Sequence, residues 1–287
     1  MRMELATSPG SAERPNEDWA SVALPASGQG GSLVVLDGVT PPAGDDGCLH
    51  GVPWFTARLG GALIELGTSR RDLALTEILS AAIRRTADAH RGTCDLSHVR
   101  TPQATVVLAR WGGPGPGGTE VAGGSGAADG VAGSGVTEGA DEVEYLVLSD
   151  STLLLETPAG EVTAVLDDRL DRLPREALRT HASADALRNA EGGFFTAAAD
   201  PAVAARAVTG RVPRAGVRSL TALTDGASRW TDLFKEGDWT DCVTLLRSSG
   251  PQTLIDRVRA VETATAGQAE PVRWKLHDDA TAVFVEP

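Results

Sequence analysis

The stretch Ser32-Leu33-Val34-Val35-Leu36-Asp37-Gly38-Val39 joins a run of large apolar residues directly to an acidic residue and a glycine. The apolar run predicts a buried strand, and Asp37-Gly38 predicts a change of direction at its end. Three further acidic motifs lie at predicted strand ends: Asn16-Glu17-Asp18, Thr224-Asp225-Gly226 and His277-Asp278-Asp279-Ala280-Thr281. One such motif is ordinary, whereas four indicate that carboxylates from distant segments meet in one place.

Carboxylates gathered in this way have a physical consequence. They repel one another and resist burial unless a cation compensates their charge. Sites built only of oxygen ligands favour hard divalent cations, Mg²⁺ and Mn²⁺ in particular. The four motifs therefore predict a metal site assembled by the fold, and metal-assisted chemistry at that site.

Composition narrows the class of protein. The chain has 287 residues, a formal net charge of −13 and 41% apolar residues, which is enough for a full core. The negative charge argues against a nucleic-acid partner and against binding to an anionic membrane surface. The sequence contains no apolar run of signal-peptide or membrane-span length, so we expect a cytoplasmic protein.

The three cysteines, Cys48, Cys94 and Cys242, lie far apart in the sequence. No pair has the spacing of a zinc site, and an odd number cannot close into a complete disulfide framework. Cys48 with nearby His50 does not make a metal site on spacing alone. Free, mostly buried thiols in a reducing compartment are therefore expected.

Apolar periodicity predicts strands, two helices, several strands with one short helix among them, two helices and a final strand. Strands are predicted at 19–24, 32–39, 103–110, 144–148, 152–156, 161–166, 218–224 and 280–285. Helices are predicted at 52–66, 73–90, 201–208, 238–247 and 254–265. Regular βαβ alternation is absent, so we expect an α+β fold with mainly antiparallel sheets and helix pairs outside them.

Six motifs, taken in order, resemble those of the metal-dependent serine/threonine protein phosphatases, the type 2C or PPM family, and its bacterial, actinomycete-like members. Besides the acidic motifs, they are Ala104-Thr105-Val106-Val107 and Leu148-Ser149-Asp150-Ser151. The resemblance covers the chain from Arg14 to Val285 as a single domain. It implies a sandwich of two antiparallel sheets flanked by helix pairs, with a disordered Gly-rich loop at about 112–141 and a flap-like insert at about 167–210.

The resemblance also implies an activity: hydrolysis of phosphoserine and phosphothreonine in a phosphorylated protein. Two Mn²⁺ or Mg²⁺ ions would hold the attacking water. Asp37 would bridge both ions, and the Gly38 carbonyl would complete one coordination shell. Asp225 and Asp278 would hold the other ion.

Three more carboxylates take supporting roles by the same resemblance. Glu17 and Asp18 would orient ion-bound waters. Asp150 would form a weaker third ion site with Asp225. The segment 167–196, where the family's substrate flap would lie, has no matching sequence and leaves the substrate open.

Two departures from the family pattern bear on catalysis. Glu13 stands where the family usually has an arginine that binds the substrate phosphate, and Arg14 follows it as the candidate for that contact. Val39, directly after the second acidic motif, cannot donate a proton. His50 is then a candidate general acid, because histidine titrates near neutral pH; a helix-start histidine bonded to the backbone is the alternative.

Three functions remain in view. A metal-dependent protein phosphatase is the leading prediction. A catalytically weak phosphatase-fold module that binds a phosphorylated partner is the second, and the departures at Arg14 and Val39 keep it open. An unrelated two-metal phosphodiesterase would need a histidine-rich ligand motif, which the sequence lacks.

Overall fold

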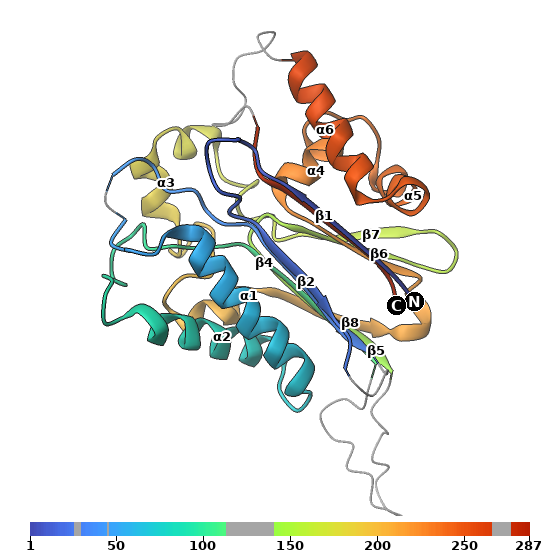
Figure 1. The fold of residues 1–287 in the computed structure, drawn as a ribbon, viewed down its shortest axis with the longest axis horizontal. Helices are drawn as coiled ribbons and strands as arrows, with labels where there is room; N and C mark the ends of the chain where they lie inside the picture. Colours follow the sequence, from blue (N-terminus) through green and yellow to red (C-terminus); the bar gives the residue numbers. More distant parts are fainter. Residues whose placement is uncertain (26–29, 45, 113–140, 266–276) are drawn as a thin grey trace, which may run out of the picture.

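Two five-stranded antiparallel sheets face each other, with helices on their outer faces (Figure 1). This computed structural model describes residues 1–25, 30–44, 46–112, 141–265 and 277–287. The predicted sandwich is confirmed. Nearly all of the Gly-rich loop predicted at about 112–141 lies outside the described residues.

All neighbouring strands pair antiparallel. The first sheet has the order β1 (Arg2–Ser8), β10 (Ala280–Glu286), β9 (Ser219–Leu223), β6 (Thr152–Glu156) and β7 (Val162–Val165). The second has the order β2 (Trp19–Ala23), β3 (Gly31–Leu36), β4 (Val106–Trp111), β5 (Glu142–Leu148) and β8 (Val208–Pro213).

The helices cover both outer faces. The α-helices are α1 (Gly51–Ser69), α2 (Leu75–His90), α3 (His181–Leu187), α4 (Asp225–Asp232), α5 (Trp239–Ser249) and α6 (Pro251–Thr265). Short 3₁₀ helices are η1 (Arg175–Leu178), η2 (Pro201–Arg206) and η3 (Arg214–Gly216). Figure 1 shows α1 and α2 on one side of the sandwich and α4, α5 and α6 on the other. Among the described residues, no helix has the length and apolar character needed to cross a membrane.

The strand β3 shows how the layers are built. All its side chains are buried, as its apolar run predicts. Val34 and Leu36 pack toward α1 and α2, whereas Leu33 and Val35 pack into the layer between the sheets. Burying each side chain of this size stabilises the fold by roughly 1.5–3 kcal/mol. Strand β3 is therefore packed on both faces up to its last residue, Leu36, directly before Asp37.

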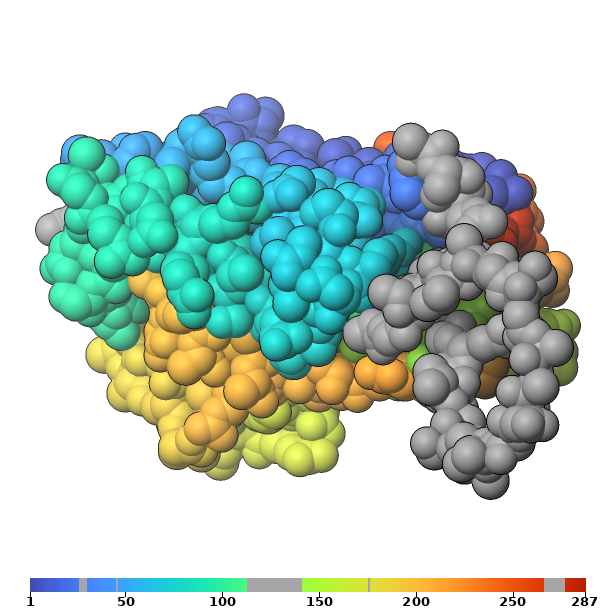
Figure 2. Space-filling view, turned by 90° about the horizontal axis from the view of Figure 1, so that it is seen from below, coloured from blue at the N-terminus to red at the C-terminus, as the bar shows by residue number. Residues whose placement is uncertain are grey.

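The α2 helix packs its apolar face, with Ile78, Leu79 and Ile83, against the second sheet and α1. Its outer surface is visible in Figure 2, where the chain around η2 lies alongside it. The segment predicted as a helix at 201–208 is this 3₁₀ helix, and it leads into β8.

The sequence did not predict β1, β8 or α4. Every second residue of β8 is exposed, and β1 is only partly buried, since both are edge strands. Their apolar pattern is correspondingly weak. Asp225-Gly226 was predicted only as an acidic motif at the end of a strand, and in the structure Asp225 also begins α4.

Candidate metal centre and active site

The acidic motifs meet at one end of the sandwich. Asp18 directly precedes β2, and Asp37 directly follows β3. Since Trp19 pairs with Leu36 in antiparallel register, the two carboxylates emerge at the same end of the second sheet.

The first sheet delivers its carboxylates to the same end. Asp150 lies between β5 and β6, and Asp225 follows β9 by two residues. Asp278 lies two residues before β10, which pairs antiparallel with β9. The structure thus brings together five of the predicted site residues, which we call the carboxylate cluster: Asp18, Asp37, Asp150, Asp225 and Asp278.

Asp37 is the most strongly affected member of the carboxylate cluster. Burial raises its pKa well above the usual range, and the negative charges of Asp18, Asp225, Asp278 and Asp150 raise the pKa further. The Asp37 backbone N–H donates to Thr105 Oγ1 at 3.2 Å, so the central strand fixes its position. A carboxylate held at the centre of like charges is a natural position for a bridging cation ligand.

Asp18 shows the same lack of compensating charge. Burial raises its pKa to about 8, with Asp279 and Asp225 adding to the rise, although hydrogen bonds from Thr281 and Thr224 oppose it. Thr224 Oγ1 donates to Asp18 Oδ2 at 3.0 Å. Asp18 Oδ1 is buried and has no hydrogen-bond partner among the described residues. An unpartnered buried carboxylate oxygen is costly, and a cation or a cation-bound water would satisfy it.

Glycine is required at two places because chains approach closely. A Cβ at Gly38 would lie 2.4 Å from Val52 Cγ1 and 2.6 Å from the Glu17 carbonyl oxygen. A Cβ at Gly226 would lie 2.0 Å from the Asp279 carbonyl oxygen. The glycines after Asp37 and Asp225 therefore let the acidic motifs pack against one another.

Asp279 is a positioning residue that the sequence reasoning did not assign to the site. Its two carboxylate oxygens accept the backbone N–H groups of Gly10 and Glu17, each at 2.7 Å. It thereby fixes both ends of the loop from Gly10 to Glu17. The sequence shows that Asp278 and Asp279 are adjacent. It does not show that Asp278 belongs to the carboxylate cluster while Asp279 accepts hydrogen bonds from the backbone.

Arg229 was also missed. Its guanidinium donates to Glu262 Oε1 at 2.6 Å and to Asp278 Oδ2 at 3.1 Å. The side chains of Arg229 and Glu262 are only 2% and 1% exposed. Arg229 compensates part of the negative charge at Asp278 and engages one of its oxygens. It lies one turn into α4, a helix that the sequence did not predict.

The remaining predicted residues, Glu17, Arg14 and His50, have different surroundings. Glu17 accepts a hydrogen bond from the Thr40 hydroxyl beside Gly38. Arg14 is exposed on the loop whose ends Asp279 fixes. His50 contacts the sulfur atoms of Cys48 and Cys94 and stacks on Trp54.

The general-acid prediction for His50 gains no support from these contacts. The cysteines also differ from expectation, because Cys48 and Cys94 are only half-buried and lie together, while Cys242 is buried. Spacing along the sequence could not show this, since the approach of Cys48 to Cys94 depends on how α1 and α2 pack.

The donors of the carboxylate cluster fit hard divalent cations. Its side-chain ligands are all carboxylate oxygens, one of them buried without a partner. Arg229 supplies one positive charge at the edge, but several interacting carboxylates remain. Mn²⁺ and Mg²⁺ match such ligands.

Comparison with solved structures identifies the fold. The chain is similar to a serine/threonine phosphatase from S. agalactiae, with 14% sequence identity, a TM-score of 0.58, and coverage of 100% of this chain and 99% of the other. It is likewise similar to the Mycobacterium tuberculosis serine/threonine phosphatase PstP/Ppp, with 15% identity, a TM-score of 0.55, and coverage of 99% and 97%.

A third similar structure is the PPM Ser-Thr phosphatase MsPP from Mycobacterium smegmatis in complex with cacodylate, with 15% identity, a TM-score of 0.52, and coverage of 100% and 98%. No protein-family model matches the sequence, and no curated protein matches it. The likeness therefore lies in the course of the backbone along the whole chain. The resemblance predicted from the six motifs is confirmed at that level: the chain has the fold of the PPM-type serine/threonine phosphatases.

Proposed function

We propose that the protein is a metal-dependent phosphatase that hydrolyses phosphoserine and phosphothreonine in proteins. The observation that carries the proposal is the carboxylate cluster: five aspartates from separate segments converge, and Asp18 Oδ1 is buried without a partner among the described residues. Isolated buried carboxylates would be expelled or protonated, so their convergence favours a role in holding cations.

The side chains divide the work of holding the ions. Asp37, in the middle of the carboxylate cluster, would bind both cations, with the Gly38 carbonyl beside it. Asp225 and Asp278 would hold the second cation, and Asp150 with Asp225 would hold a weaker third. Two such cations, when bound, supply a water of lowered pKa and neutralise charge on the phosphoryl oxygens.

The remaining residues would set the geometry around the reacting phosphate. The Asp279 carboxylate holds the loop from Gly10 to Glu17 by accepting hydrogen bonds from the backbone N–H groups of Gly10 and Glu17. That loop carries Arg14, whose exposed guanidinium offers a bidentate fork to a phosphate group. Asp18 and Glu17 would accept hydrogen bonds from water and keep it oriented toward the phosphorus.

A second function has its own support. Arg14 lies one residue away from the family position, and Val39, directly after Asp37-Gly38, cannot donate a proton. Both features suit a regulatory module that binds a phosphorylated partner without hydrolysing it. Because the net charge of −13 disfavours nucleic acid and anionic membranes, a phosphoprotein in the cytoplasm is the partner we propose in either case.

Phosphopeptides separate the two functions. We expect the wild-type protein to release phosphate from phosphoserine and phosphothreonine peptides with added Mn²⁺ and to release none with EDTA. Binding of the same peptides without phosphate release, at saturating Mn²⁺, would favour the regulatory module. Failure both to bind and to hydrolyse them would contradict both functions.

A further inference from the structure

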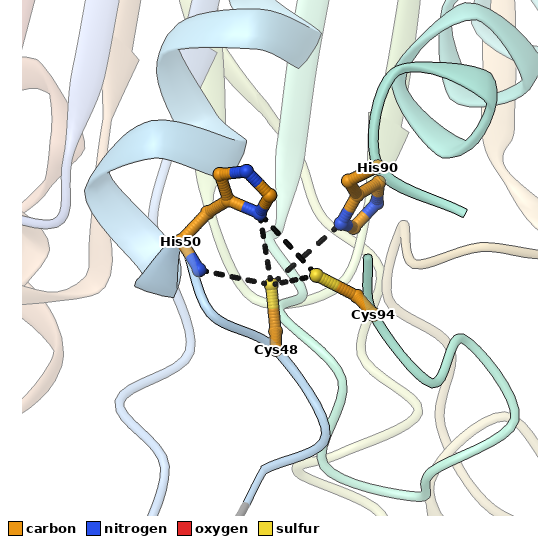
Figure 3. Close-up of side chains that lie close together, drawn as sticks. All are labelled: Cys48, His50, His90 and Cys94. Atoms are coloured by element: carbon orange, nitrogen blue, oxygen red, sulfur yellow. Dashed lines mark hydrogen bonds between the residues drawn. The ribbon is translucent and has the colours of Figure 1, made fainter. Parts of the chain in front are cut away.

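Four metal-binding side chains gather at the ends of α1 and α2, away from the acidic motifs in the sequence. His50 directly precedes α1 and Cys48 lies two residues before His50, while His90 is the last residue of α2 and Cys94 follows four residues later. Figure 3 shows both imidazole rings directed at the two sulfur atoms. We call these residues the cysteine–histidine group.

The ligand atoms of this group are close to one another. Cys94 Sγ lies 3.4 Å from Cys48 Sγ and 3.3 Å from His50 Nδ1. Cys48 Sγ lies 3.6 Å from His90 Nδ1 and 3.8 Å from His50 Nδ1. All four ligand atoms lie within 4.8 Å of one another.

These separations match a tetrahedral ion. Zinc bonds of about 2.3 Å to sulfur and about 2.0–2.1 Å to nitrogen place tetrahedral ligands about 3.3–3.8 Å apart. A set of two thiolates and two imidazoles in this geometry is typical of Zn²⁺ and unlike the ligands that Mg²⁺ or Mn²⁺ prefer. We propose that Cys48, His50, His90 and Cys94 form a structural zinc site.

Surrounding contacts prepare the ligands for a cation. The backbone N–H groups of Leu49 and His50 donate to the Cys94 and Cys48 sulfurs, each at 3.4 Å, and so hold the two sulfur atoms in place. The His50 ring stacks on Trp54 with ring centres 4.2 Å apart, which fixes its orientation. Such outer contacts are what orients the ligands of protein metal sites.

The imidazole of His90 is also placed to bind a metal, because its Nδ1 lies 3.6 Å from Cys48 Sγ. The ring is largely buried and lies 5.1 Å from Trp54, centre to centre.

Four protein ligands leave no open position for substrate, so the site is structural. It would tie the start of α1 to the end of α2. The start of α1 has no side-chain cap: His50 occupies the N-cap position without capping the helix. Val52, in the first turn, contacts Gly38 beside Asp37. A zinc ion would therefore hold the helix end against which the second acidic motif packs.

The cobalt-substituted protein provides the most specific test. Co²⁺ bound by thiolates gives a sulfur-to-cobalt charge-transfer band and intense tetrahedral visible bands, whereas Co²⁺ bound by carboxylates gives no thiolate band. We expect the full-length, metal-depleted protein to develop the thiolate band with Co²⁺ and to lose it when Zn²⁺ is added. Excess Mg²⁺ should not displace either ion.

Variants locate the site. Zinc retained after purification, a single ion per chain, should be lost in Cys48→Ala and Cys94→Ala and kept in the matched control Cys242→Ala. If a site variant fails to fold, thiol titration of the wild type still decides. Added Zn²⁺ should protect two thiols from modification under native conditions, and chelation should expose them.

Several results would overturn the proposal. One is a missing thiolate band with Co²⁺ in the reduced wild-type protein. Another is equal zinc loss in Cys242→Ala. A third is an intramolecular Cys48–Cys94 disulfide as the stable state of the isolated protein, which would make the pair a redox element in place of a zinc site.

Discussion

The carboxylate cluster and the cysteine–histidine group differ in how the fold assembles them. The first collects hard ligands of one charge from the ends of strands in both sheets. The second collects soft ligands from the ends of two packed helices. In the described part of the chain, it is the one group of three or more His, Cys, Asp or Glu residues whose ligand atoms all lie within 4.8 Å of one another. Neutral thiols and imidazoles can bond to one another without an ion, whereas carboxylates cannot approach closely until a cation neutralises them. The ligand atoms of the cysteine–histidine group are thus already close together, whereas the carboxylate cluster would need bound cations to draw its oxygen atoms together.

The largest expected effect tests how much of the carboxylate charge the protein itself compensates. Arg229→Met removes the buried guanidinium that contacts Glu262 Oε1 and Asp278 Oδ2, while Arg259 and His277 still contact Glu262 Oε2. We therefore expect the free energy of unfolding to fall by about 3 kcal/mol, the lower end for a broken buried ion pair. Urea unfolding measures it. Arg85→Met, which breaks an exposed pair with Glu65, is the control and should cost about 0–1 kcal/mol. Equal losses in both variants would show that the buried ion pairs of Arg229 contribute no more stability than the exposed ion pair of Arg85.

The next effect concerns positioning. Asp279→Ala removes the acceptor for the backbone N–H groups of Gly10 and Glu17, so the loop bearing Arg14 loses its anchor. We expect kcat/KM for a phosphopeptide to fall by about 10–100-fold with Mn²⁺ binding retained. Asp171→Ala, at an exposed position, serves as the control. Unchanged kinetics would remove Asp279 from the site.

The free energy of unfolding, measured over a range of pH, tests whether Asp18 is uncharged in the metal-free folded protein. Burial raises the pKa of Asp18 from 3.8 to about 8, so the metal-free folded state binds a proton that the unfolded state releases. Stability contributed by that proton is present at low pH and is lost as pH rises toward 8. In EDTA, Asp18→Asn should therefore gain stability over the wild type steadily between pH 4 and pH 8, by at most about 1.4 kcal/mol per pH unit. An advantage that is constant with pH would contradict the raised pKa.

The smallest effect concerns the substrate phosphate. Arg14→Ala should raise KM and lower kcat/KM with metal binding intact, and Arg14→Lys should restore little, because lysine lacks the bidentate fork. Stability should change by less than about 0.5 kcal/mol, since Arg14 is exposed. Wild-type kinetics in both variants would exclude Arg14 from the site and favour the regulatory module.

The two sites also show what a single sequence reveals. Each acidic motif can be recognised locally, either as an apolar strand followed by Asp-Gly or as a loop before a strand. The order of the motifs along the chain gave the resemblance that predicted the sandwich. Asp279 and Arg229 cannot be recognised in this way, because their roles depend on backbone N–H groups and on α4. The cysteine–histidine group was missed for a related reason: His50 and His90 are brought together only by the packing of α1 on α2.

The function proposed for the carboxylate cluster is to hold the cations that drive hydrolysis. Titrating Mn²⁺ into wild type and Asp37→Asn, with bound ions counted by electron paramagnetic resonance and phosphate release followed in the same samples, tests it most directly. In wild type, the rate should rise with occupancy. In Asp37→Asn, tight Mn²⁺ binding should be lost and the rate should fall by at least about 100-fold, while the zinc content stays unchanged. Hydrolysis that persists in Asp37→Asn, or in wild type with EDTA, would show that cations bound at the carboxylate cluster do not drive the reaction.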